Sequence, residues 1–170
     1  MHCKVCDFGL SRTVQSTTNN TMTRNIGTLL YLCPEMLTDN DNNSNMDKAS
    51  RATKVDVYSF GMIMWEVFFE QAPYTESSKT CKLLTNQQPT NPINVLTLVV
   101  NGKRPSIPFD TRDELLEWMQ VYPVGIPSEK CGIVLGYFEL VRVCWDVLPR
   151  NRPDFQTICK RLRSWINQME

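Results

Sequence analysis

The stretch VDVYSFGMIMWEVFF, residues 55–69, decides the fold of this 170-residue chain. Apolar side chains would lie on nearly every side of the helix that it forms, and a helix without a polar face is buried in a protein core. Thr53 or Asp56 could cap its start, because their side-chain oxygens accept hydrogen bonds from free backbone N–H groups. We therefore expect a central buried helix around which the other segments pack.

Four further segments have helical patterns. Residues 94–100 form a short apolar run that Asn101-Gly102 would end. Thr111 and Glu114 have the spacing of a capping box ahead of a small helix. Residues 133–145 are rich in apolar side chains, and in the last segment apolar residues recur at three- and four-residue steps, namely Phe155, Ile158, Leu162, Trp165 and Met169. With one short β stub at the N-terminus, running into Asp7-Phe8-Gly9, the fold is predicted to be mainly α.

Three polar runs interrupt the apolar segments, at residues 13–23, 38–54 and 75–92. They are rich in Thr, Asn, Ser, Asp and Gln, which is the composition of loops with little to bury. Each run is flanked by apolar segments that must pack against one another to form a core, so we interpret these runs as surface insertions within one domain. A further insertion is expected near residues 110–132.

The composition excludes several classes of protein. Lys plus Arg and Asp plus Glu number 18 each, so we expect neither nucleic acid nor an anionic membrane as a partner. The longest apolar stretch, 60–69, contains Glu66 and is too short to span a bilayer. Seven cysteines without regular spacing favour free thiols in a reducing compartment. Cys3 and Cys6 could form half of a metal site, but nothing in the sequence completes it, since His2 is the only histidine.

A series of short motifs runs through the chain in a fixed order: Asp7-Phe8-Gly9, Gly27-Thr28, Pro34-Glu35, Asp56 to Gly61 with Trp65-Glu66, Pro73-Tyr74, Gly102 to Pro105, Cys144-Trp145 and Pro149 to Phe155. Each motif is weak when taken singly. The whole series resembles the C-terminal lobe of protein kinases, from the activation segment to the last helix. The resemblance implies a partial kinase domain over residues 1–170, with an activation segment at 1–37, a polar insertion at 38–54 and a helical subdomain at 55–170. The N-terminal lobe would be absent.

The resemblance assigns roles to the first motif and to one ion pair. Asp7 would hold Mg²⁺ against the phosphates of ATP, Phe8 would pack beneath that site, and Gly9 would allow the backbone to turn. Glu35 and Arg152 would form a buried ion pair that ties the activation segment to the late helices, since neither charge is tolerated alone in a core. A solvated surface arginine is the alternative for Arg152.

Other residues have roles that the resemblance only suggests. Asp56 resembles a buried acid that accepts hydrogen bonds from the catalytic loop, and here it should have lost those donors. Thr21 and Thr23 are candidate phosphorylation sites or ordinary loop residues. The Gly27-Thr28 motif is similar to the motif at this place in Ser/Thr-specific kinases, whereas the motif at residues 56–61 is similar to that of tyrosine kinases. That mixture is typical of the tyrosine-kinase-like group, whose members mostly phosphorylate Ser and Thr, and dual or Tyr specificity stays open.

Most of the catalytic parts of that family have no counterpart in these 170 residues. The sequence contains no Gly-rich phosphate loop, no strand lysine with a helix glutamate, and no His-Arg-Asp-x-x-x-x-Asn loop. We therefore expect a member of the Ser/Thr kinase family that uses ATP, Mg²⁺ and a protein substrate in its complete domain and is inactive as this chain alone. The missing N-terminal part would be its natural partner, because one side of the central helix would otherwise be exposed. Its setting would be the cytoplasm or the cytoplasmic part of a membrane receptor. The alternatives are a non-catalytic kinase-like binding module and a nonfunctional remnant.

Overall fold

The structure, a computed structural model, describes residue 4 and residues 29–37, 48–74 and 92–169. These residues form five α-helices and three short 3-10 helices, and no strand occurs among them. In chain order the elements are η2 (Pro34–Met36), α2 (Lys48–Phe69), α3 (Pro92–Val100), α4 (Arg112–Val121), η3 (Ser128–Lys130), α5 (Cys131–Cys144), η4 (Pro149–Asn151) and α6 (Phe155–Met169). Apart from residue 4, the predicted β stub at the N-terminus lies outside the described residues.

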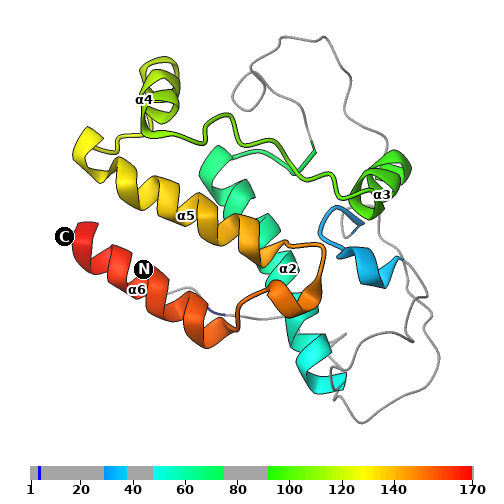
Figure 1. Ribbon diagram of the computed structural model, residues 1–170. Helices are drawn as coiled ribbons and strands as arrows, with labels where there is room; N and C mark the ends of the chain where they lie inside the picture. Colours follow the sequence, from blue (N-terminus) through cyan, green and yellow to red (C-terminus); the bar gives the residue numbers. More distant parts are fainter. Residues whose placement is uncertain (1–3, 5–28, 38–47, 75–91, 170) are drawn as a thin grey trace.

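Helix α2 is the centre of the arrangement, with α5 crossing it and α6 running beside α5 (Figure 1). The crossing is close because Gly61 has no side chain: a Cβ atom there would lie 2.8 Å from Cβ of Cys144. The predicted buried helix is confirmed on one side, where the following side chains are buried: Val57, Tyr58, Met62, Met64, Trp65 and Phe69. Its other side carries Ile63 and Val67, which are 46% and 68% exposed.

Helix α2 begins at Lys48, seven residues before the expected start at residue 55. Residues 48–54, the last part of the predicted polar insertion at 38–54, are therefore helical and continue into the central helix. The segment contains Ala, Lys and Arg, which favour helix even when they contribute nothing to a core. Neither predicted cap acts as one, since both residues lie inside the helix and Thr53 Oγ1 donates to the carbonyl oxygen of Ala49 at 3.1 Å.

The predicted ends of two other helices are confirmed. Helix α3 stops where Gly102 takes a positive φ of 77°, and the amides of Gly102 and Lys103 return to the carbonyls of Val99 and Leu98. This pairing satisfies carbonyl groups that a helix end leaves free. Helix α4 opens with the predicted capping box, in which Thr111 and Glu114 each accept a bond from the other's backbone amide at 3.3 Å. The insertion near residues 110–132 is thus partly an ordered helix.

An aromatic cluster joins the end of α2 to α4 and to the middle of α5. Phe68 and Phe69 at the end of α2 pack against Phe138 of α5, with ring centres 4.7 and 5.4 Å apart. Phe109 and Trp118 complete the cluster from the α4 side. Because large aromatic side chains bury much apolar area, this cluster holds α4 onto the central helix.

Candidate functional site

Arg152 is a charged residue whose side chain is nevertheless buried, with only 1% exposure. It follows η4, a short turn that Pro149 begins. Its Nη1 and Nη2 atoms donate to Oε1 and Oε2 of Glu35 at 2.6 and 2.9 Å, which is a two-pronged guanidinium–carboxylate pair. The same guanidinium donates to the carbonyls of Asp146 and Lys54, each at 2.9 Å. The predicted ion pair is therefore present, and the alternative of a solvated Arg152 is excluded.

The pair connects three parts of the chain that are distant in sequence. Glu35 lies in η2, which Pro34 begins, while the carbonyl of Lys54 belongs to α2 and Arg152 precedes α6. Lys54 Nζ in turn donates to the carbonyl oxygen of Arg152. A buried guanidinium needs its full set of acceptors, so the segment that carries Glu35 is held in one place against the helices.

Tyr58 supports this pair from within α2. The guanidinium carbon of Arg152 lies 5.0 Å from the centre of the Tyr58 ring, and that of Arg104 lies 5.1 Å from it. Arg104 also donates from Nε to the carbonyl of Trp145 at 2.9 Å. Sequence reasoning gave no role to Tyr58 or Arg104. Both residues lie in motifs of the kinase-like series, but the sequence alone does not predict that two guanidinium groups contact one tyrosine ring, because that contact depends on the fold.

Burial and charge change the acid–base properties of this site. Burial alone would raise the pKa of Glu35, but the hydrogen bonds and positive charge of Arg152 outweigh it and lower that pKa below 4.5. Burial, followed by the neighbouring Glu35 carboxylate, raises the pKa of the Cys33 thiol to about 12. Glu35 is thus ionised and Cys33 neutral at physiological pH.

A second connection fixes the same segment to α2. The Tyr31 hydroxyl donates to Oε2 of Glu66 at 2.7 Å, and the Ser59 hydroxyl donates to the carbonyl of Tyr31 at 3.0 Å. Burial and the bond to Glu66 raise the pKa of Tyr31 to about 12. Residues 29–37 are therefore attached at both ends, through Tyr31 and through Glu35.

The prediction that Asp56 is a buried acid is wrong for this chain. Asp56 is exposed, on the third turn of α2, and partial burial raises its pKa only through desolvation. Within the described part of the chain, no group donates a hydrogen bond to its carboxylate. An exposed carboxylate is solvated by water, so the expected cost of losing its donors does not arise.

Several predicted residues lie outside the described residues: Asp7, Phe8, Gly9, Thr21, Thr23 and Thr28. Among the residues that are described, no group of three or more His, Cys, Asp or Glu side chains could hold a metal ion. None of the described helices is long and apolar enough to cross a bilayer.

Comparison with known proteins identifies the family. A model of the protein kinase domain matches residues 1–164. A probable LIM domain-containing serine/threonine-protein kinase of Dictyostelium discoideum is 31% identical over 94% of this chain and 18% of its own length. A dual specificity protein kinase of the same organism is 31% identical over 95% of this chain and 16% of its own length. Human receptor-interacting serine/threonine-protein kinase 1 is 29% identical over 99% of this chain and 22% of its own length.

The chain therefore belongs to the protein kinase domain family. Its helical body is the C-terminal lobe of that fold, as the motif series predicted, and the described residues include no part of an N-terminal lobe. The chain spans less than a quarter of the length of these three relatives.

Proposed function

We propose that this chain is the helical lobe of a kinase that transfers a phosphoryl group from ATP to Ser and Thr hydroxyls of protein substrates. The observation that carries the proposal is the Glu35–Arg152 pair, supported by Tyr31 and Glu66. These contacts hold residues 29–37, the end of the predicted activation segment, against α2. Phosphoryl transfer depends mainly on positioning and electrostatic stabilisation, so a rigidly held segment is what the reaction requires from this lobe.

The cofactors of the complete domain would be ATP and Mg²⁺. Mg²⁺ would neutralise charge on the phosphates, and Asp7 is the carboxylate proposed to hold it. The described residues contain no cluster of three or more possible metal ligands, so this assignment rests on the Asp7-Phe8-Gly9 motif. Thr21 and Thr23 stay proposed sites of regulatory phosphorylation.

A reducing, cytoplasmic setting is part of the proposal. The cysteines in the described residues are Cys33, Cys131, Cys144 and Cys159, and all four are free thiols. Three of them are buried in the helical core, where a thiol acts as a small apolar side chain.

The 170 residues should not transfer phosphate by themselves. They contain no candidate base and no second Mg²⁺ ligand of the His-Arg-Asp-x-x-x-x-Asn type. The second candidate function is a non-catalytic binding module, which the exposed apolar residues Ile63 and Val67 favour. A module would have no need of Asp7, and a remnant without function would need neither Asp7 nor the ion pair.

The test uses the native polypeptide, captured from its own cells with an antibody against α6. It is incubated with Mg²⁺, ATP and a mixed Ser/Thr/Tyr peptide substrate, and the phosphorylated amino acids are identified. We expect phosphoserine and phosphothreonine from a polypeptide much larger than 19.6 kDa. Asp7→Asn should abolish transfer, and Asp113→Asn, on the exposed side of α4, should leave it unchanged. A native band of 19.6 kDa without transfer would favour the binding module, and transfer by the pure 170-residue chain above its Asp7→Asn control would contradict the predicted incompleteness.

A further inference from the structure

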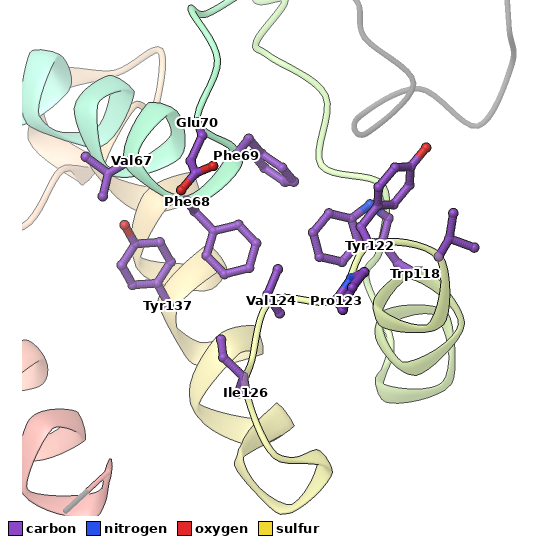
Figure 2. A pocket seen from close by; sticks show the side chains of 11 residues that line it. Val67, Phe68, Phe69, Glu70, Trp118, Tyr122, Pro123, Val124, Ile126 and Tyr137 are labelled. Carbon is purple, nitrogen blue, oxygen red and sulfur yellow. The ribbon is translucent and has the colours of Figure 1, made fainter.

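A cavity of about 690 Å³ lies where α2 and α4 end, and nothing in the proposed phosphoryl transfer uses it (Figure 2). Its walls are the last turns of those two helices, the loop at residues 122–126 and one side chain of α5, Tyr137. A volume of this size is within the range that binds drug-sized molecules. The surroundings of the cavity determine which chemistry it would accept.

Four aromatic rings form one side of the cavity. Their centres follow one another at 5.4 Å from Tyr122 to Trp118, 6.0 Å from Trp118 to Phe68, and 6.0 Å from Phe68 to Tyr137. Neighbouring ring planes are inclined by only 32–37°. The Tyr137 hydroxyl is already bound, since it donates to the carbonyl of Met64 at 2.7 Å. The cavity is therefore lined by several aromatic rings, whose electron-rich faces attract cations.

The electrostatic environment at this place is negative. The C-terminal ends of both α2 and α4 meet the cavity, and the C-terminal end of a helix carries a partial negative charge. Helices often place Lys, Arg or His there, but neither of these two has a basic residue in its last turn. Among the described residues that line the cavity, Glu70 is the one charged residue, and its carboxylate adds a full negative charge.

Glu70 occupies a backbone position that favours a different residue. Its φ is 54°, in the left-handed region where a helix end usually has Gly, because a side chain there crowds the backbone. Figure 2 shows the Glu70 side chain at the edge of the cavity beside Phe68. Strained positions of this kind cluster at sites with a function. Here the unfavourable backbone places a carboxylate next to an aromatic surface.

We propose that this cavity binds a small organic cation, in which an alkylammonium or trimethylammonium group is attached to an apolar body. The apolar body would pack on the rings of Trp118 and Phe68, and the cation would lie near Glu70 and the two helix ends. A neutral molecule would gain only the apolar contact. An anion would meet the negative helix ends and the carboxylate.

The test is a titration of the full 170-residue chain, observed through the indole N–H signal of Trp118. Three probes share a phenyl group and differ in charge: benzyltrimethylammonium, 3-phenylpropanamide and 3-phenylpropionate. The cation should bind most tightly and shift the Trp118 signal but not that of Trp165, which lies on α6 away from the cavity. Equal affinity for all three probes, or no change at Trp118, would overturn the proposal.

Substitutions separate the charge effect from the cavity itself. Glu70→Gln should weaken binding of the cation about two- to five-fold, the range for one partly exposed charge pair. Glu117→Gln, an exposed α4 carboxylate outside the lining, is the matched control and should leave binding unchanged. Val121→Lys introduces a cation at a lining position that is 67% exposed, where it should not disturb folding, and should reduce binding more than Glu70→Gln does. Equal effects of Glu70→Gln and Glu117→Gln would contradict the role of Glu70. Dimerisation that competes with the cation would show that a second copy of the chain is the occupant.

Discussion

Replacing Arg152 by Met should cost this chain a large part of its folding free energy. Arg152 is 1% exposed and donates to both carboxylate oxygens of Glu35 and to the carbonyls of Asp146 and Lys54. Met has a comparable length and supplies none of these bonds, so it leaves a carboxylate with 13% side-chain exposure unpaired. Breaking one side of a buried pair costs about 3–5 kcal/mol, against a total of about 5–15 kcal/mol for a domain.

The assay is urea unfolding followed by tryptophan fluorescence. Arg150→Met, two residues away at an exposed position, is the matched control and should change the free energy of unfolding by less than about 0.5 kcal/mol. Arg152→Lys should lie between the two, because an ammonium group cannot bind both carboxylate oxygens in a planar fork. If Arg152→Met lost no more than Arg150→Met, the Glu35–Arg152 pair would not be what holds this segment, and the reasoning would fail.

The same pair predicts how stability depends on pH. The pKa of Glu35 is lowered in the folded chain, so its contribution is fully present above the unfolded value near 4.5 and is lost as pH falls through the lower folded value. The difference in unfolding free energy between the wild-type chain and Glu35→Gln should therefore be constant from pH 7 to about pH 5 and shrink below that. A difference that does not change between pH 7 and pH 3 would contradict the assignment.

Two further substitutions test how α2 is packed. Gly61→Ala would bring a methyl group within 2.8 Å of Cβ of Cys144 and should destabilise the chain by about 1–3 kcal/mol. Gly132→Ala is the control and should be neutral or slightly stabilising, because a Cβ atom there would meet nothing within 4 Å. Thermal unfolding compares the two variants, and equal melting temperatures would refute the close crossing of α2 and α5. Tyr31→Phe removes the hydroxyl that donates to the Glu66 carboxylate and should lower the free energy of unfolding by about 1.5–3 kcal/mol. A loss that is the same in a Glu66→Ala background, which has no acceptor at this place, would show that this bond does not form.

The fold was predictable where the sequence pattern reflects burial. The apolar stretch at residues 55–69 gave the central helix, and the Thr111–Glu114 capping box gave α4. The start of α2 at Lys48 could not be predicted from the sequence. Residues 48–54 are mostly polar, so they lack the three- and four-residue spacing of apolar side chains that indicates a helix. Burial of Asp56 was inferred from the family and failed, since burial depends on what packs against the residue.

The site was predictable only in part. Glu35 and Arg152 were identified because both stand in Pro-flanked motifs whose order the family preserves. The roles of Tyr58 and Arg104 were not predicted, because they depend on two guanidinium groups contacting one ring across the fold. The cavity proposed to bind a cation was not predicted for a similar reason. Neither the strained backbone of Glu70 nor the meeting of two helix ends can be recognised in the sequence.

The central claim is that the Glu35–Arg152 pair fixes the end of the predicted activation segment onto the helical lobe. Amide hydrogen exchange tests it most directly, because the amides of Met36 and Leu37 are bonded within that segment, to the carbonyls of Cys33 and Pro34. In the wild-type chain we expect slow exchange at Met36 and Leu37. In Arg152→Lys exchange there should accelerate about ten-fold or more while amides in the middle of α5 stay protected. Unchanged exchange at Met36 and Leu37 in Arg152→Lys would contradict the account.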